Sequence, residues 1–171
     1  MNESSPTADP KENPRATKLL NAEEIVVSNG GLVLRLAGLY SLERGAHAFW
    51  LKKSASGVVK DVKGREDGII NLLNYDDAAG ACVAALRLDQ VSNRGGDSCR
   101  QMFLISDGNP TTRGGICSSA LRSTLFQSCS KPQFLGGPDD NLGKVYDGSI
   151  SNAELRWKAV HQSFDAFMSS S

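Results

Sequence analysis

The stretch from residue 69 to residue 87 constrains the fold of this chain more than any other part, because its hydrophobic period changes within a few residues. Residues 69–73 form a short apolar run that is too short for a helix and typical of a buried strand. Small and apolar side chains then recur at helical spacing: Ala78, Ala81, Cys82, Ala85 and Leu86. A helix with such a face can lie close to a sheet. The stretch therefore predicts a strand–turn–helix unit, with its helix near residues 76–88.

Polar residues at the junction of this unit predict how its helix begins. Asn74 and Asp76 offer side-chain oxygens that can cap the first turn, and Asp77 adds a second negative charge near the helix N-terminus. Because capping already accounts for both acids, we interpret Asp76 and Asp77 as structural caps rather than as catalytic carboxylates.

The same alternation of helix and strand extends along the chain. A helix is expected near residues 15–29, and residues 32–39 form an almost continuous apolar run, typical of a strand covered on both faces in a parallel sheet. Another strand is expected near residues 101–105. The apolar positions of the first helix are Leu19, Ala22, Val26 and Val27. This alternation predicts an α/β fold with a parallel sheet.

Shorter elements complete the pattern. They are helices at residues 46–51, from Thr111 or Thr112 to about 126, at 151–157 and at 163–168, and a strand at 133–135. Residues 1–13 are polar and contain proline, with Asn13 as a candidate helix cap. We therefore expect a flexible N-terminal segment over residues 1–13 and one domain over residues 14–171.

Composition excludes several classes of function. Lysine and arginine number 19, as do aspartate and glutamate, so no basic field favours a nucleic acid. The four cysteines (Cys82, Cys99, Cys117 and Cys129) form no C-x-x-C pair, and there are only two histidines. We therefore expect no metal site and no disulfide framework, and scattered thiols fit a reducing compartment. With no apolar run near the roughly 18 residues of a membrane span and no signal sequence, we expect a soluble, intracellular protein without a membrane partner.

Two residues invite a functional interpretation by their type alone. Arg35 interrupts the apolar run at residues 32–39, so its guanidinium needs either a carboxylate partner or a ligand. We favour the structural ion pair. His47 could act as a general base, but neither an acid nor a nucleophile lies beside it in the sequence, so an ordinary surface histidine is expected.

Motifs in a fixed order carry a resemblance to a known family. They are residues 3–7, Arg15 with 19–23, 34–40, 44–47, 71–78, 103–110, 143–144, 155–157 and 163–164. Together they resemble the C-terminal half of the NAD(P)-dependent epimerase/dehydratase family, the extended or atypical short-chain dehydrogenase/reductases, and the plant and cyanobacterial type is most similar. The resemblance covers nearly the whole chain.

The resemblance implies the C-terminal part of a Rossmann-like parallel sheet with a small substrate-side α/β lobe. It also implies substrate-side candidates on the strand near the nicotinamide and just after it: Arg35, Tyr40 and His47. The family's Tyr-Gly-Pro is Tyr40-Ser-Leu here, and the family's capping glutamate after Thr112 is replaced by Gly115. The Gly-rich dinucleotide loop and the Tyr-x-x-x-Lys pair of the family do not occur in the sequence. The intact family uses NAD(P), but we expect the isolated chain to bind no cofactor and to contain no catalytic residue.

Two functions remain open on these grounds. The chain is either the substrate-side half of an epimerase/dehydratase-like oxidoreductase that is inactive alone, or a non-catalytic interaction module that pairs with an intact relative. In both cases apolar surface would be left uncovered, so we expect self-association or docking onto a relative through the strand edge and the helix face near Leu19 and Val26. The compartment is expected to be the chloroplast or the cytoplasm, although no transit peptide is visible.

Overall fold

A computed structural model of the chain describes residues 1–7, 9, 14–51, 61–92 and 100–170. The helices are α1 (Pro14–Ser28), α2 (Ala46–Leu51), α3 (Tyr75–Ser92), α4 (Arg113–Ala120), α5 (Ser149–Leu155) and α6 (Phe164–Ser169). The strands are β1 (Val33–Leu36), β2 (Gly38–Tyr40), β3 (Ile69–Ile70), β4 (Leu72–Asn74), β5 (Met102–Ile105) and β6 (Thr111–Thr112). The predicted mixed α/β fold is confirmed.

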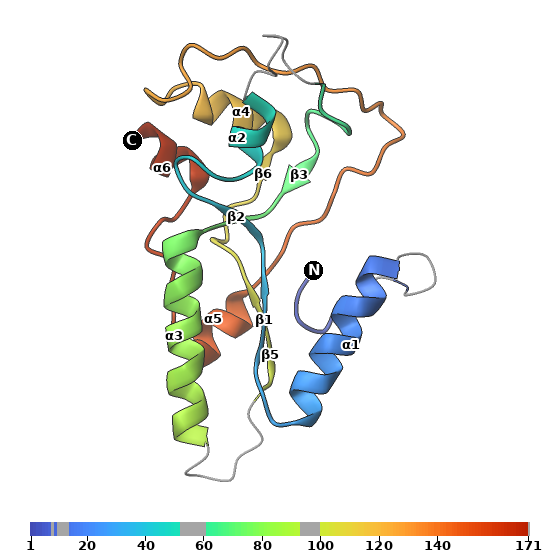
Figure 1. The fold of residues 1–171 in the computed structure, drawn as a ribbon, viewed down its shortest axis with the longest axis vertical. Helices are drawn as coiled ribbons and strands as arrows, with labels where there is room; N and C mark the ends of the chain where they lie inside the picture. Colours follow the sequence, from blue (N-terminus) through green and yellow to red (C-terminus); the bar gives the residue numbers. More distant parts are fainter. Residues whose placement is uncertain (8, 10–13, 52–60, 93–99, 171) are drawn as a thin grey trace.

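Two parallel strand pairs form the centre of the molecule. β1 pairs with β5 in parallel, with Leu34 beside Phe103, and β2 pairs with β4 in parallel, with Tyr40 beside Asn74. β3 and β6 form a short antiparallel pair. Figure 1 shows β1 and β5 between α1 on one side and α3 on the other, while α2, α4 and α6 gather in a smaller lobe beyond β2. The arrangement agrees with the α/β class predicted from the alternation of elements.

Each lobe has its own hydrophobic core. In the larger lobe, the small-residue face of α3 is buried against β5, with Ala81 and Ala85 close to Phe103 and Ile105. This confirms the predicted role of the small residues, which let the helix approach the sheet. In the smaller lobe, Tyr40, Leu51, Ile116, Phe164 and Met168 belong to the second core.

Each of the two long apolar runs forms two short strands instead of the single strand that was predicted. The run at residues 69–73 forms β3 and β4, which pair with different partners on either side of Asn71. The run at residues 32–39 forms β1 and β2, separated at Ala37. An apolar run predicts extended backbone, but hydrogen-bond partners decide where a strand ends, and here they change as the chain passes from one lobe to the other.

The surface of α1 and β1 differs from the prediction. α1 turns Leu20, Glu23 and Val27 toward β1, each half-buried, whereas Leu19 is 61% exposed and Val26 is 40% exposed. β1 is half-buried at Val33–Arg35 and exposed at Leu36, so it is not covered on both faces as its apolar sequence predicted. Among the described strands β1 has a neighbour on one side only, and this explains the incomplete burial.

Two shorter elements also differ in extent. The helix expected to reach about residue 126 ends at Ala120, because Ser123 turns back and donates from both its backbone N–H and its hydroxyl to the carbonyl of Ala120. The strand expected at residues 133–135 is a single bridge between Phe134 and Val62. The expected Asn13 cap lies outside the described residues. The short helices near residues 46–51, 151–157 and 163–168 are confirmed with shifts of up to two residues.

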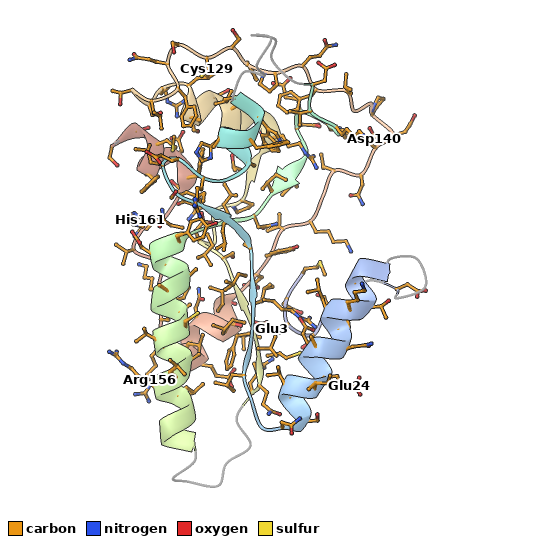
Figure 2. All side chains as sticks on the ribbon, viewed as in Figure 1. Glu3, Glu24, Cys129, Asp140, Arg156 and His161 are labelled. Atoms are coloured by element: carbon orange, nitrogen blue, oxygen red, sulfur yellow. The ribbon has the colours of Figure 1, made fainter. Side chains whose placement is uncertain are left out.

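The first residues of the chain contact its C-terminal part. The amino group of Met1 donates to the carbonyl of Val145 at 2.6 Å, and the Asp147 N–H donates to the carbonyl of Met1 at 2.7 Å. Glu3, labelled in Figure 2, accepts a hydrogen bond from the backbone N–H of Ser151 at 3.0 Å and thereby places a carboxylate at the first turn of α5. The flexibility of residues 1–13 and the domain boundary at residue 14 stay predictions. No helix of the described residues is long and apolar enough to cross a membrane.

Candidate functional site

A cleft of about 460 Å3 opens at the carboxyl end of β1, where parallel α/β sheets commonly bind ligands. We call it the strand-end cleft. Its lining includes Leu36, Gly38, Ile70, Asn71, Arg113 and Lys144. The apolar side chains come from β1 and β3, and the polar ones come from Asn71, from the start of α4 and from the segment at residues 141–146. The cleft therefore joins elements that are more than a hundred residues apart in sequence.

Close backbone contacts hold the polar wall of the cleft in place. The side chain of Asn71 donates to the carbonyl of Lys144 at 2.7 Å and accepts from the N–H of Tyr146 at 2.8 Å. Gly143 has a positive φ of 95°, and a methyl group on its Cα would lie 2.6 Å from the carbonyl oxygen of Ile69. Only glycine allows this approach, so Gly143 and Asn71 together position Lys144 at the cleft.

The charges around the strand-end cleft are all positive. Arg113 and Lys144 line it, and no aspartate or glutamate does so among the described residues. The guanidinium of Arg113 occupies space that two glycines leave free: a methyl group on Gly68 would lie 1.8 Å from its Nη1, and one on Gly64 would lie 3.2 Å from its Cζ. The arrangement suits an anionic ligand, because guanidinium and ammonium groups form strong hydrogen bonds with carboxylate and phosphate oxygens.

Buried polar side chains cluster at the ends of neighbouring strands in the small lobe. The Tyr40 hydroxyl, Nδ2 of Asn74 and Oδ2 of Asp107 are buried, and none has a hydrogen-bond partner among the described residues. Burial raises the pKa of Asp107 to about 7, although the N–H of Asn109 donates to the carboxyl group and opposes the rise. Burial, with the charges of Asp107 and Asp77, also raises the pKa of Tyr40, while the nearby Asn74 side chain lowers it by less. The carboxyl group of Asp107 is therefore partly protonated at neutral pH.

The two acids predicted as helix caps have different roles. Oδ1 of Asn74 accepts from the Asp76 N–H at 2.9 Å and so caps α3 as expected. Asp77 is buried, and its two oxygens accept from the backbone N–H groups of Val160 at 2.6 Å and His161 at 3.0 Å. Asp76 is exposed, and its carboxylate lies 3.7 Å from the His161 ring. Asp77 thus fastens the C-terminal segment to α3, a contact that local sequence could not predict.

The expectation that His47 is a surface residue is wrong. Its ring is fully buried in the small lobe, edge-on to Phe126 and close to Phe164, and Nε2 lies 3.0 Å from the carbonyl of Leu42. α2 is short and amphipathic, and His47 lies on the face that it turns to the core together with Ala48 and Leu51. Burial lowers the pKa of His47, which keeps the ring neutral.

Arg35 forms an ion pair. Its Nε donates to Oε1 of Glu23 at 2.9 Å and its Nη2 donates to Oε2 at 2.5 Å, and these hydrogen bonds raise the pKa of the guanidinium. Of the two roles considered for Arg35, this is the structural one. Tyr40 and His47 both lie against Phe164, but Arg35 is in the other lobe. The three substrate-side candidates are therefore not brought together, none lines the strand-end cleft, and a substrate role for them stays a prediction.

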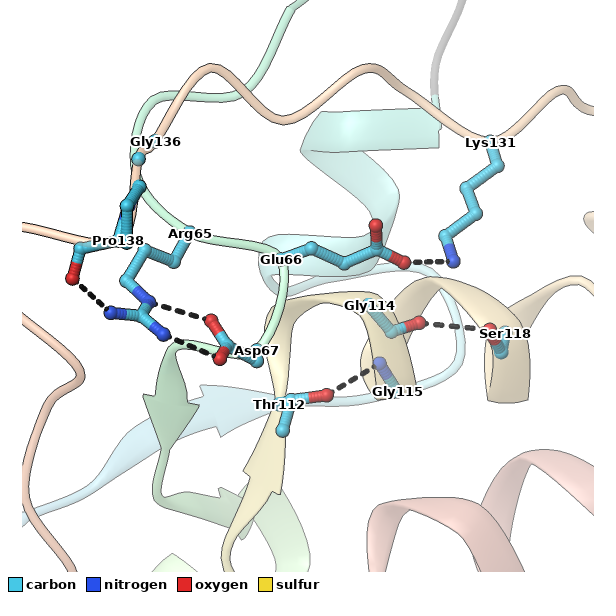
Figure 3. Close-up of a pocket in the computed structure, with 11 residues that line it drawn as sticks. Arg65, Glu66, Asp67, Thr112, Gly114, Gly115, Ser118, Lys131, Gly136 and Pro138 are labelled. Carbon is cyan, nitrogen blue, oxygen red and sulfur yellow. Dashed lines mark hydrogen bonds and ion pairs between the residues drawn. The ribbon is translucent and has the colours of Figure 1, made fainter. Parts of the chain in front are cut away.

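A second, larger cleft of about 650 Å3 lies at the N-terminus of α4 (Figure 3). Its charged side chains are paired with each other: Arg65 with Asp67 through two hydrogen bonds of 2.7 Å, and Lys131 with Glu66 at 2.5 Å. The first N–H groups of α4 also have acceptors, since Gly114 donates to the carbonyl of Glu66 and Gly115 donates to the Thr112 hydroxyl. This cleft offers an anion no free helix terminus, and Glu66 and Asp67 would repel one.

Sequence reasoning missed Arg113 and Lys144 as candidate ligand-binding residues. They are 31 positions apart, and neither stands in a charged pattern. Lys144 and Asn71 belong to the motifs that carry the family resemblance, which was the available signal for them. No cluster of metal-ligating side chains occurs among the described residues, and the described cysteines, Cys82, Cys117 and Cys129, are free thiols.

Comparison with solved structures identifies the fold. One match is UDP-glucuronic acid 4-epimerase from Bacillus cereus in complex with NAD, with a TM-score of 0.72 and 14% sequence identity. The aligned region covers 99% of this chain and 53% of the epimerase chain. UDP-N-acetylglucosamine 4-epimerase from Methanobrevibacter ruminantium M1 matches 99% of this chain and 55% of its own at a TM-score of 0.73 and 13% identity. The Bordetella bronchiseptica enzyme WbmG, in complex with NAD, matches 99% and 51% at a TM-score of 0.64 and 19% identity.

The chain spans about half the length of the solved structures that it matches. No family model and no curated protein matches the sequence. At these identities the comparison shows the fold. The fold predicted from the family resemblance, that of one half of an NAD-dependent epimerase or dehydratase, is confirmed.

Proposed function

We propose that this chain is the substrate-side half of an NAD(P)-dependent epimerase/dehydratase-like oxidoreductase and that it has no activity alone. The observation that carries the proposal is the strand-end cleft at the carboxyl end of β1. The fold around it matches about half of the chain of a solved epimerase. Ligands of open α/β sheets bind at such strand ends. In this reading the chain binds and orients a substrate, and the reaction needs a dinucleotide-binding half.

The chemistry of the cleft favours an anionic substrate. Arg113 and Lys144 would hold a phosphate or carboxylate group, while Leu36 and Ile70 would contact the less polar part of the molecule. Solved structures with this fold include one with UDP-N-acetylmuramic acid and one with UDP-glucuronic acid and NAD. A nucleotide sugar is therefore the substrate class that we propose to test first.

The residues present do not fit a dinucleotide. A dinucleotide diphosphate needs a glycine-rich turn and free N–H groups at a helix start. Among the described helices, α4 has two glycines in its first turn, Gly114 and Gly115. The backbone N–H groups of Arg113, Gly114 and Gly115 already donate to acceptors within the protein, so they are not free to bind a diphosphate. The family's Tyr-x-x-x-Lys is absent from the sequence, so the chain supplies no such acid for proton transfer. We therefore assign no chemical step to this chain.

A second candidate function is a non-catalytic interaction module that pairs with an intact relative. The exposed Leu19 and Val26 of α1 and the half-buried β1 favour it, since these apolar groups have no cover among the described residues. The free thiols of Cys82, Cys117 and Cys129 fit a reducing compartment and thus the chloroplast or the cytoplasm. Co-purification with a full-length relative, in the absence of nucleotide-sugar binding, would favour this second function.

Calorimetric titration of the purified chain with UDP-glucuronic acid tests the first proposal. We expect binding that Arg113→Gln and Lys144→Gln each weaken by about tenfold or more, because a hydrogen bond to a charged group contributes about 1.5–3 kcal/mol. Arg100→Gln is the matched control, since Arg100 is paired with Glu154 and does not line the cleft. NAD is expected not to bind. Equal effects of all three substitutions, or binding of NAD alone, would contradict the proposal.

A further inference from the structure

We propose that a hollow between α3 and α5 binds a small amphiphilic anion, that is, a carboxylate or phosphate group on an apolar body. We call it the helix hollow. It has a volume of about 400 Å3 and is lined by Ala84, Arg87, Leu88, Glu154, Leu155 and Arg156. The inference is independent of the proposed function, since none of these residues lines the strand-end cleft.

The helix hollow lies on the side of the sheet that α5 closes. α5 packs against both α3 and β5, and Figure 1 shows it beside α3, with α1 on the other side of β1 and β5. The Ser151 hydroxyl in the first turn of α5 accepts from the Leu104 N–H of β5 at 2.8 Å, so α5 occupies the edge of β5 that faces away from β1. A sheet that continues past β1 would extend away from α5. Such a continuation would leave the helix hollow uncovered.

Two exposed arginines on the rim of the helix hollow are unpaired within the described part of the chain. Neither Arg87 nor Arg156 forms an ion pair there. The one carboxylate in the lining, on Glu154, accepts from Nε of Arg100 at 2.7 Å and is thereby neutralised. Guanidinium groups form strong and often bidentate hydrogen bonds with carboxylate and phosphate oxygens. The helix hollow therefore offers two uncompensated positive charges to an anion.

The backbone of Arg156 indicates that its side chain has a role. Figure 2 shows Arg156 beside α3, and its φ of 49° and ψ of 41° at the end of α5 are left-handed. Among the residues that the structure describes, it is the one non-glycine residue with a positive φ. Helices often end in this conformation, but usually with glycine, because a Cβ is unfavourable there. An arginine at this position costs stability, and no described ion pair offsets the cost. This favours a ligand as the partner of Arg156.

The floor of the helix hollow is apolar. Ala84 and Leu88, one turn apart on α3, are half-buried, and Leu155 at the end of α5 is buried. All three belong to the core of the larger lobe or pack against it. Sites for small molecules have volumes of roughly 300–1,000 Å3 and combine apolar walls with a few charged groups. The helix hollow has this size and composition, whereas a protein partner would need on the order of 1,200 Å2 of buried surface.

Tryptophan fluorescence of the full chain tests the proposal, with decanoate as the probe. The chain has two tryptophans, so Trp50→Phe leaves Trp157 as the reporter, which follows Arg156 and lies against Gly80 of α3. We expect saturable binding of decanoate and decyl phosphate below their micelle concentrations, and the tighter of the two identifies the preferred head group. Decanol and inorganic phosphate should bind much more weakly, because each offers only one half of this chemistry.

Variants of the rim locate the binding. Arg87→Gln and Arg156→Gln should each weaken decanoate binding about twofold to fivefold, and together about tenfold, since ion pairs at exposed side chains are individually weak. Lys158→Gln is the matched control, because it removes the same charge two positions from Arg156 and Lys158 does not line the helix hollow. Arg156→Gly should weaken binding while the urea midpoint stays unchanged or rises, because glycine favours the left-handed backbone.

Four results would overturn the proposal. They are the absence of saturable binding by both anionic probes, binding of decanol or of inorganic phosphate as tight as that of decanoate, equal effects of Lys158→Gln and the two arginine variants, and a lower urea midpoint for Arg156→Gly. The last result would show that Arg156 stabilises the fold through its side chain and does not need a ligand as partner.

Discussion

The contact between Asp77 and the C-terminal segment allows a sharp test of how the two lobes hold together. Asp77 and Asp76 are adjacent acids in the first turn of α3, so each has about the same favourable interaction with the helix dipole. Asp77 alone accepts hydrogen bonds from the backbone N–H groups of Val160 and His161. We compare Asp77→Ala with Asp76→Ala, which changes the same charge in the same turn.

The magnitude follows from these contacts. Two hydrogen bonds to a charged group contribute about 3–6 kcal/mol together, and part of this is recovered if water reaches the freed N–H groups. The side chain of Val160 is exposed, so water can approach there, and we expect Asp77→Ala to lower the free energy of unfolding by about 2–4 kcal/mol. Asp76→Ala loses only the dipole interaction and a weak surface pair with His161, and should lower it by less than about 1 kcal/mol.

Urea denaturation followed by circular dichroism measures the free energy of unfolding of both variants. Asp77→Asn keeps one acceptor oxygen, so its loss of stability should lie between those of Asp76→Ala and Asp77→Ala. All samples need the same protein concentration, because self-association would add to the apparent stability. Equal losses for Asp76→Ala and Asp77→Ala would refute the reasoning, since they would show that helix capping is the whole contribution of Asp77.

Three further outcomes follow from the structure. Because the pKa of Asp107 in the folded protein is raised from 3.8 to about 7, the free energy of unfolding should decrease as the pH rises from about 4 to about 7. The urea midpoint of the wild type should decrease over this range, and that of Asp107→Asn should not. Because the folded pKa of His47 is lowered from 6.5, stability should be lost as the pH falls below 6.5, and His47→Gln should lessen that loss; a loss of the same size in the variant would contradict this. Gly143→Ala should cost about 1–3 kcal/mol and weaken anion binding in calorimetry, whereas Gly137→Ala, with open space at its Cβ, should change neither.

Sequence reasoning correctly predicted the features that depend on residues close together in the chain. The small residues of α3 and the cap at Asn74 follow from patterns within a few positions, and the structure contains both as predicted. The strand partners could not be read in the same way. An apolar run shows that a segment is extended and buried, but the break at Asn71 arises because that side chain binds residues 144 and 146.

The burial of His47 illustrates a second limit. Histidine is an intermediate residue in burial statistics, and in a six-residue helix its face is decided by what packs on it. Phe126 and Phe164 come from segments about 80 and 117 positions later, so no local pattern reveals the aromatic surroundings. The same holds for the strand-end cleft, whose charged residues come from different elements of the chain.

The balanced charge of the whole chain does not determine the charge of the strand-end cleft. Several described acids are already engaged elsewhere, since Glu23 binds Arg35, Asp67 binds Arg65 and Glu66 binds Lys131. Asp77 is likewise engaged, by backbone N–H groups. Arg113 and Lys144 form no ion pair among the described residues, so the two charges that line the strand-end cleft are not neutralised by a carboxylate. A chain with no net charge can thus carry a locally positive surface where a parallel strand ends.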